Sequence, residues 1–166
     1  MEFRNSPIIE KAPNSTTPLV GIVTFETDEP ATAEIDIDDG KQSRTVSFNY
    51  APARQHSCQV LGLKPDTAHQ LTVRARGESG EITEAPNRLE LKTPPLPDDF
   101  PPIEVLSCTP EKREPGYIIF SASYGAMNKI PEKPGFLVAM DQQGDIVWHH
   151  RENDPIYDVR RLPNGN

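Results

Sequence analysis

Apolar and polar residues alternate along most of the first 95 residues of the chain. In each alternating run, the apolar members fall on one face of an extended segment: Leu19, Gly21, Val23, Phe25, Ala33, Ile35, Ile37, Val46, Phe48, Tyr50, Leu71, Val73, Ala75, Leu89 and Leu91. A period of two is typical of a strand that buries one face and exposes the other. Turn signals separate the runs at residues 26–30, at Asp39-Gly40 and at Ser79-Gly80. With a short first strand near Ile8-Ile9, about seven strands fit this region, which predicts an immunoglobulin-like sandwich.

The stretch from Gly62 to Ala75 holds the most specific pattern of the first half. Pro65 and Asp66 predict a corner that leads into a strand. Residues typical of such a corner stand at fixed spacing: Leu63, Pro65, Thr67, Leu71, Val73 and Ala75. Their order resembles the corner and the following strand of the fibronectin type III family.

His69 stands where that family has a tyrosine. The hydroxyl of the corner tyrosine bonds to backbone a few residues upstream, and an imidazole is able to donate a similar bond. No other histidine, cysteine or carboxylate accompanies His69 at the spacing of metal ligands. We therefore predict a structural role for His69 and neither a metal-binding nor a catalytic one.

Five prolines within residues 93–102 mark a break in the chain. Dense prolines favour an extended, semi-rigid spacer. The sequence therefore predicts three parts: a fibronectin III-like sandwich over 1–93, a proline-rich linker over 94–102, and the start of a second β domain over 103–166. Leu96 and Phe100 are expected to pin the linker onto a domain surface.

The second half has shorter strands and longer connections. Five strands are predicted there, in the order Ile103–Leu106, Tyr117–Ala122, Phe136–Asp141, Asp145–His150 and about Tyr157–Leu162. The second of them is almost wholly apolar, as in a strand covered on both faces. A polar connection, Tyr124–Gly135, precedes a hairpin with a turn at Gln142-Gln143-Gly144. At the end, Asn164-Gly165 is a strong hairpin-turn signal with no partner strand after it, so we expect the domain to be truncated.

Several motifs of the chain occur in the order found in one known family. They are the opening Pro18–Gly21, the linker phrase Pro95–Pro101, the hairpin residues Ala139, Asp141, Gly144 and Trp148, and the run Arg161–Asn166. The hairpin resembles one blade of a β-propeller, and the whole order is similar to bacterial arylsulfotransferases, in which a β-sandwich precedes a six-bladed propeller. The resemblance implies an all-β fold: an immunoglobulin/fibronectin III-like sandwich followed by the first strands of a truncated β-propeller.

The resemblance also implies an activity for a longer parent protein. Members of that family transfer a sulfuryl group from a phenolic sulfate to a phenol through a sulfated histidine, without a nucleotide donor. The residues responsible come from later propeller blades, so none is carried over to this chain. We expect the parent to be an enzyme and this portion to be non-catalytic, with no catalytic, cofactor-binding or metal-binding residue and no cofactor.

His149 and His150 invite a catalytic interpretation because they are adjacent. Neighbouring residues of a strand point to opposite faces, so the two imidazoles are not expected to line one pocket. We predict that they are ordinary strand and loop residues.

Composition narrows the list of partners. The net charge is −8, which argues against nucleic acid, because binding there depends on lysine and arginine. No apolar stretch is long enough for a membrane helix, and no signal peptide is visible. The parent family suggests a periplasmic or extracellular location. Cys58 and Cys108 lie in different predicted domains and are expected to be free thiols, at least one of them buried.

Two smaller motifs have ordinary explanations. Asn14-Ser15-Thr16 matches a glycosylation sequon, but such triplets arise often by chance. The acidic residues Asp36, Asp38 and Asp39 suggest an oxygen-rich cation site, and a solvated strand edge with a turn is the better interpretation.

A second function class fits the same order of folds. A fibronectin-type module before a propeller also occurs in non-enzymatic surface-binding or adhesion proteins. In either case residues 1–97 should fold alone, whereas 103–166 should need cover from the sandwich or from a second copy. A homodimer through the sandwich or through exposed propeller strands is therefore a partner to test.

Overall fold

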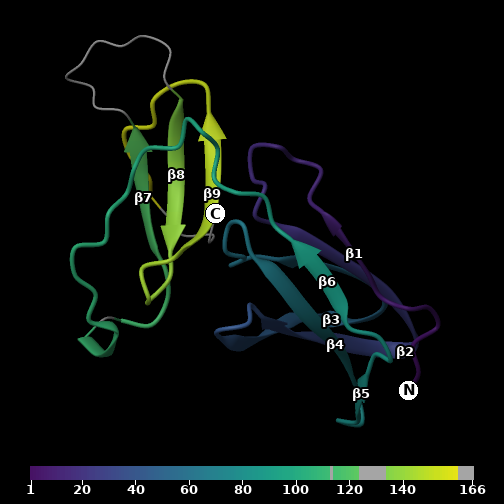
Figure 1. Ribbon diagram of the computed structural model, residues 1–166. Helices are drawn as coiled ribbons and strands as arrows, with labels where there is room; N and C mark the ends of the chain where they lie inside the picture. Colours follow the sequence, from purple (N-terminus) through teal and green to yellow (C-terminus); the bar gives the residue numbers. More distant parts are fainter. Residues whose placement is uncertain (113, 124–133, 161–166) are drawn as a thin grey trace.

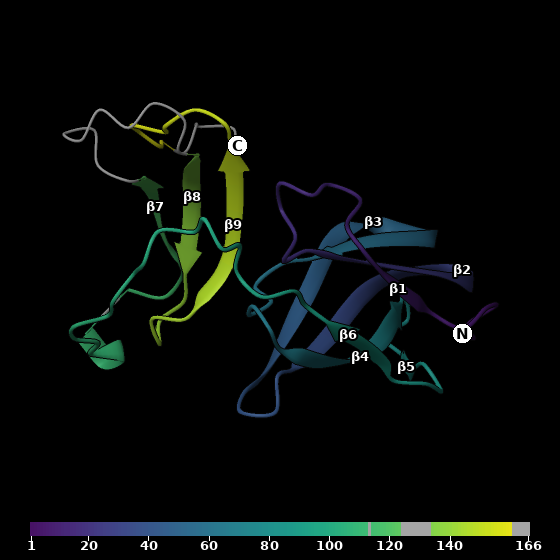
Figure 2. The same ribbon diagram turned by 45° about the horizontal axis from the view of Figure 1, so that its top comes forward.

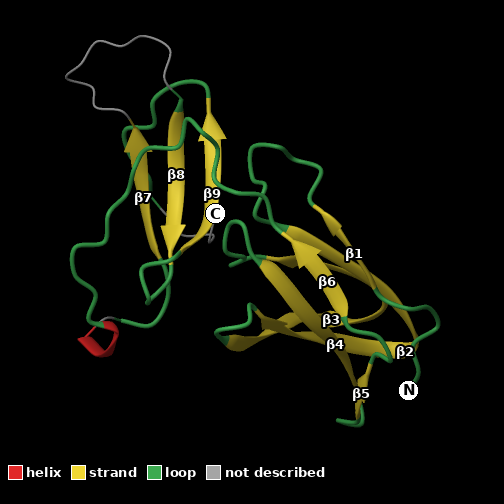
Figure 3. Cartoon of the chain, in the orientation of Figure 1, coloured by secondary structure: helices red, strands yellow, loops and turns green. Residues whose placement is uncertain are grey.

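The computed structural model describes residues 1–112, 114–123 and 134–160, which form two antiparallel sheets (Figure 1, Figure 3). The first sheet contains six strands: β1 (Ile8–Lys11), β2 (Gly21–Asp38), β3 (Ser43–Val60), β4 (Ala68–Gly77), β5 (Ile82–Glu84) and β6 (Leu89–Lys92). The second contains β7 (Ile118–Ser123), β8 (Gly135–Met140) and β9 (Ile146–Glu152). One turn of 3-10 helix, η1 (Pro110–Lys112), precedes β7, and the described residues include no α-helix. The predicted all-β class is confirmed.

The first sheet is built around a long hairpin of β2 and β3, each 18 residues long. The first part of β2 pairs with β1 and with the end of β3, while its second part pairs with β4 and with the start of β3. β4 in turn pairs with β5 and β6. The hairpin thus runs through both layers of the immunoglobulin-like domain and joins them.

The predicted turn at residues 26–30 is wrong, because β2 continues through it with a register shift between Glu26 and Ala31. Residues at the N-terminus pair with this segment and keep it extended. The amide of Arg4 donates to the Glu26 carbonyl at 2.8 Å, and the amide of Asp28 donates to the Glu2 carbonyl at 3.0 Å. In the same way the alternating run at Val46, Phe48 and Tyr50 is only part of a longer strand, because β3 continues to Val60.

The alternating pattern predicts the core correctly at most positions. Apolar residues from both layers join one buried cluster, including Val23, Phe25, Ile35, Leu71 and Val73. Burial of a side chain of this size contributes about 1.5–3 kcal/mol.

Tyr50 is an exception, since its side chain is 68% exposed. The expectation that it faces inward is wrong because the pairing of β2 with β3 is irregular here. Ala33 opposes Phe48, yet Ala31 opposes Ala53, so several residues of β3, Tyr50 among them, have no partner on β2. The extra residues carry the tyrosine out of the alternating pattern.

The second sheet has the order β7-β8-β9. Its central strand is the most buried, with Phe136 and Val138 both at 0% exposure. β7 was predicted to be covered on both faces, but Ile118 and Ile119 are 49% and 55% exposed. It is an edge strand, because the described residues supply a neighbour, β8, on one side of it.

Two further expectations for the second half differ from the structure. Ile103–Leu106 is not a strand. The predicted last strand is not formed over residues 157–160, and its remaining two residues lie outside the described part of the chain. The predicted polar connection Tyr124–Gly135 also lies mostly outside the described residues.

The second sheet lies beside the first domain, with β9 as its nearest strand (Figure 2). The amide of Arg151, on β9, donates to the Thr16 carbonyl of the first domain at 3.0 Å. A second contact joins Lys64 of the first domain to Asp145, which precedes β9, at 2.9 Å.

Gly135, the first residue of β8, allows a close backbone contact. A Cβ at this position would lie 2.5 Å from the Ile156 nitrogen and 2.6 Å from the Asp154 oxygen. A methyl group there must displace backbone, whereas a Cβ at Gly77 would meet its neighbours at 3.6 Å or more. We expect Gly135→Ala to destabilise the second sheet by about 1–3 kcal/mol, the range for overpacking. Gly77→Ala is the matched control, and urea denaturation followed by Trp148 fluorescence measures both. Equal effects of the two substitutions would contradict the close contact.

Candidate functional site

The corner between β3 and β4 brings the first domain to the second sheet. Residues that bond locally build this corner, since the Thr67 hydroxyl donates to the Pro65 carbonyl at 2.8 Å. The amide of Thr67 donates to the Thr93 hydroxyl at 3.1 Å, and that hydroxyl donates to the Lys64 carbonyl. Asp66 takes a positive φ of 47°, which aspartate tolerates better than most residues. The corner is therefore fixed on both sides of Lys64.

His69 holds the corner from inside the domain. Its imidazole is 1% exposed, and its Nε2 accepts a hydrogen bond from the Lys64 amide at 3.2 Å. The expected bond to upstream backbone is therefore present, but the ring accepts it and does not donate. Burial lowers the pKa of His69, which favours the neutral imidazole that such an acceptor requires.

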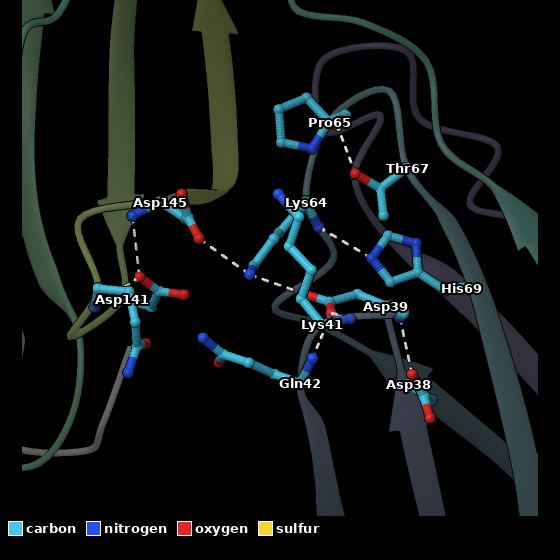
Figure 4. Close-up of polar contacts among 12 residues, drawn as sticks. Asp38, Asp39, Lys41, Gln42, Lys64, Pro65, Thr67, His69, Asp141 and Asp145 are labelled. Atoms are coloured by element: carbon cyan, nitrogen blue, oxygen red, sulfur yellow. Dashed lines mark hydrogen bonds and ion pairs between the residues drawn. The ribbon is translucent and has the colours of Figure 1, made fainter.

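Lys64 lies between two carboxylates from different sheets (Figure 4). Its Nζ is 2.7 Å from Oδ2 of Asp39, in the β2–β3 turn, and 2.9 Å from Oδ2 of Asp145, in the β8–β9 turn. The Asp39 carboxylate and the Asp145 backbone are each held by their own turn. Oδ1 of Asp39 accepts from the amides of Lys41 and Gln42, and the Asp145 amide donates to Asp141. We call Asp39, Lys64 and Asp145 the lysine bridge.

In the lysine bridge, the partners of Asp39 and Lys64 together outweigh the effect of burial on their pKa values. Burial acts to raise the pKa of the Asp39 carboxyl, but the Lys64 ammonium and the amides of Gln42 and Lys41 lower it to about 2. Burial acts to lower the pKa of Lys64, and the two carboxylates raise it overall. Asp39 and Lys64 therefore stay charged at neutral pH.

A cavity of about 280 Å³ lies beside the lysine bridge, between the two domains. Its wall includes Arg44, Gly62, Lys64, Tyr117 and Asp141. A Cβ on Gly62 would lie 2.5 Å from Nη2 of Arg44 and 3.3 Å from the Tyr117 hydroxyl, so the glycine lets these polar groups approach. Arg44 also donates to the Leu61 carbonyl. Polar and apolar surface contribute about equally to the lining, and its lysine is already shared by two carboxylates, so the arrangement suits an interface better than catalysis.

The segment between the domains makes its own contact with the second sheet. The ring of Phe100 meets the edges of Phe136 and His149, with centroids 4.9 and 5.6 Å apart. Beside it, Asp99 pairs with Arg151 at 2.7 Å. The expectation that Phe100 pins the linker onto a domain surface is confirmed, and that surface is the second sheet; the same expectation for Leu96 stays a prediction.

The two adjacent histidines of β9 lie on opposite faces, as expected. His149 is 1% exposed, whereas the side chain of His150 is 25% exposed and pairs with Glu152 at 2.7 Å. His150 also stacks on Trp148. The structure therefore does not bring the two imidazoles into one pocket.

The three acidic residues that suggest a cation site in the sequence each bond to a different partner. Asp36 pairs with Arg74, Asp38 accepts from the Gly40 amide, and Asp39 joins the lysine bridge. The described residues contain no group of three or more potential metal ligands. The side chain of Asn14 accepts from the amide and hydroxyl of Thr16.

The two cysteines differ in their exposure to solvent. Neither cysteine forms a disulfide, as predicted: Cys58 is buried, and Cys108 is exposed and donates a hydrogen bond from its thiol to the Gln142 carbonyl at 3.0 Å. Burial raises the pKa of Cys58 to about 11. Among the described residues, no helix has the length and apolar character needed to cross a membrane.

Sequence reasoning did not identify the lysine bridge. Lys64 lies in a recognised corner and Asp39 in a recognised turn, so the position of each was predictable. Asp145 is about eighty residues away in the sequence, and no local pattern links it to Lys64. Arg44 and Tyr117 were missed for the same reason.

Comparison with known proteins gives one family match. The sequence model of a family described as the arylsulfotransferase Ig-like domain matches residues 8–94. No curated protein matches the chain. A solved structure titled "Myokine structure" is similar over 54% of this chain and 96% of its own, at 20% identity and a TM-score of 0.41. The family match runs from β1 to just after β6, so it includes every strand of the first sheet.

Because of the lysine bridge, we expect Lys64 to contribute more to the free energy of unfolding than an exposed lysine does. Lys64→Met leaves the Asp39 carboxylate, whose side chain is 9% exposed, without its cation. We expect a loss of about 1–3 kcal/mol in the free energy of unfolding. Lys92→Met is the control, because Lys92 and Asp66 are 57% and 70% exposed, and such pairs contribute below about 1 kcal/mol. Urea denaturation measures both variants, and similar losses would contradict the bridge.

The lowered pKa of Asp39 also predicts how the stability of the protein changes in acid. Its pKa in the folded protein, about 2, lies below the ordinary value of 3.8. Its contribution is therefore present above about pH 4 and is lost as the pH falls towards 2. Asp39→Asn should cost about 1–2 kcal/mol at neutral pH, and the difference from wild type should shrink over that range. A difference that stays constant down to pH 2 would show that the carboxylate is not stabilised in this way.

Proposed function

The chain belongs to the arylsulfotransferase Ig-like domain family, and from that premise we propose that it is the non-catalytic N-terminal portion of an arylsulfotransferase. The parent would transfer a sulfuryl group from a phenolic sulfate to a phenol through a sulfated histidine, without a nucleotide donor. That histidine would come from a part of the protein outside these 166 residues. The family match over 8–94 is the observation that carries the proposal.

The surroundings of the four histidines support a non-catalytic role for this portion. A sulfuryl acceptor must present an accessible nitrogen near groups that stabilise the charge of the sulfate. His69 already bonds to the Lys64 amide, His149 is buried beside phenylalanines, and His56 stacks on Phe25. His150 is partly exposed, but its partner is the carboxylate of Glu152, which would repel a sulfate.

We further propose that the first domain serves as a rigid mount for the second sheet. In this proposal the second sheet opens a β-propeller, and the lysine bridge and the Phe100 contact set its orientation relative to the sandwich. A catalytic site assembled from several blades requires each blade to be held within a fraction of an ångström. A fixed mount at the first blade would serve that requirement. A dimerisation role for the sandwich remains a second proposal.

The parent is proposed to act in the periplasm or outside the cell. The coarse support is the family itself, because arylsulfotransferases are generally periplasmic enzymes.

The central prediction concerns activity. Residues 1–166 alone should not convert 4-nitrophenyl sulfate in the presence of a phenol, whereas the gene product that contains them should release 4-nitrophenol. Absorbance at the nitrophenolate band measures both. Turnover by 1–166 that is lost in His149→Ala or His150→Ala would overturn the non-catalytic assignment. An inactive complete gene product would count against the proposed reaction itself.

The mounting role has a separate test in the complete gene product. Lys64→Met should lower turnover several-fold if the bridge orients the catalytic part, while Lys92→Met should leave it unchanged. Equal activity of both variants would show that the bridge is structural for this chain and unimportant for the reaction.

A further inference from the structure

His149 is buried among aromatic rings that come from two parts of the chain. Its imidazole is 1% exposed. The ring centroids of Phe136, on β8, and of Phe100, in the connection between the domains, lie 5.9 and 5.6 Å from it, edge-on. These three residues, which we call the ring cluster, join the connection to the second sheet.

The imidazole is an unusual choice for this position. Neither of its ring nitrogens has a hydrogen-bond partner among the described residues. A buried polar group without a partner destabilises the fold that contains it, and a leucine would fill similar space without that cost. Departures from this rule concentrate at functional sites, so the presence of histidine calls for a functional account.

The ring cluster lies next to the contact between the second sheet and the first domain. Arg151, two residues after His149, pairs with Asp99, the neighbour of Phe100. The Arg151 amide donates to the Thr16 carbonyl of the first domain at 3.0 Å. A change that loosens the rings therefore acts on the attachment of the second sheet.

Charged groups surround the cluster without touching the imidazole. On β9 they are His150, Arg151 and Glu152, on the connection they are Asp98 and Asp99, and β8 carries no titratable side chain. Asp99 is held by Arg151, and Glu152 is held by His150. On protonation the His149 imidazole would thus place a positive charge against two phenylalanine rings, with no carboxylate of the described residues bonded to it.

We propose that His149 is an acid-sensitive latch: the neutral imidazole completes the ring cluster that holds the connection on the second sheet, and protonation opens that cluster. The open form exposes the imidazole to water, where its charge is solvated. Release of Phe100 then loosens the neighbouring contacts of Arg151 with Asp99 and Thr16.

The direction of the pH dependence follows from burial. Burial, and to a smaller extent His150, lowers the pKa of His149 to about 4, whereas a solvated imidazole titrates near about 6.5. Well above about pH 6.5 the imidazole is neutral in both forms, so the latch is at its most closed. As the pH falls towards 4 the open form, which binds the proton more tightly, gains population, and a gap of this size shifts the opening equilibrium on the order of a hundredfold.

Hydrogen exchange of the Arg151 amide tests the latch in the whole chain. Its opening equilibrium, corrected for intrinsic exchange, should rise by tens of fold between about pH 7 and about pH 4.5 in the wild type. The rise should be absent in His149→Leu, which keeps the apolar contact. It should be retained in His150→Gln, because the wild-type His150 ring pairs with Glu152 outside the cluster.

Two results would overturn the proposal. One is an equal rise in the leucine variant, which would assign the acid response to other groups. The other is an NMR titration of the wild-type His149 ring with a pKa near 6.5, which would show that the buried imidazole is not held neutral. The NMR titration does not depend on any variant, so it decides the matter even if His149→Leu fails to fold.

Discussion

Lys64 is held from three directions, and much of the arrangement of the two sheets depends on it. Its amide is bonded by the His69 ring, its carbonyl by the Thr93 hydroxyl, and its ammonium by Asp39 and Asp145. An exposed lysine loses much of the gain of an ion pair to side-chain entropy. Here the backbone on both sides of the side chain is already fixed, so less freedom remains to be lost. The bridge therefore loses less entropy than a typical surface pair, although its carboxylate on the second sheet, Asp145, is 51% exposed.

The second sheet is attached by contacts of different physical kinds. The lysine bridge is ionic, the Phe100 contact is aromatic, and the Arg151 amide makes a neutral hydrogen bond to Thr16. A single point of contact would leave the sheet free to rotate, and two points would leave rotation about the line that joins them. Three points fix an orientation. Salt weakens the ionic contact most, so changes of solution conditions act on the three points unequally.

The sequence predicts those features that depend on near neighbours. Burial of Val23, Ile35 and Val73 follows from a period of two, because each strand carries its own pattern. The wrong turn at residues 26–30 and the unpredicted contact of Asp145 with Lys64 share another cause. The first is governed by pairing with the N-terminal residues, and the second by a partner about eighty residues away. Local composition has no information about either, whereas the order of motifs along the chain was enough to indicate the family.

The connection between the domains belongs physically to the second sheet at one end and to the first domain at the other. Thr93 is 2% exposed and bonds within the corner of the first domain, while Phe100 completes the apolar cover of Phe136. Three prolines stand between these two anchors, and proline limits the conformations available to such a short segment. A boundary drawn by composition alone places this segment outside both domains. Its contacts instead make it part of both cores, which explains how a three-stranded sheet with an exposed edge keeps a fixed position beside the sandwich.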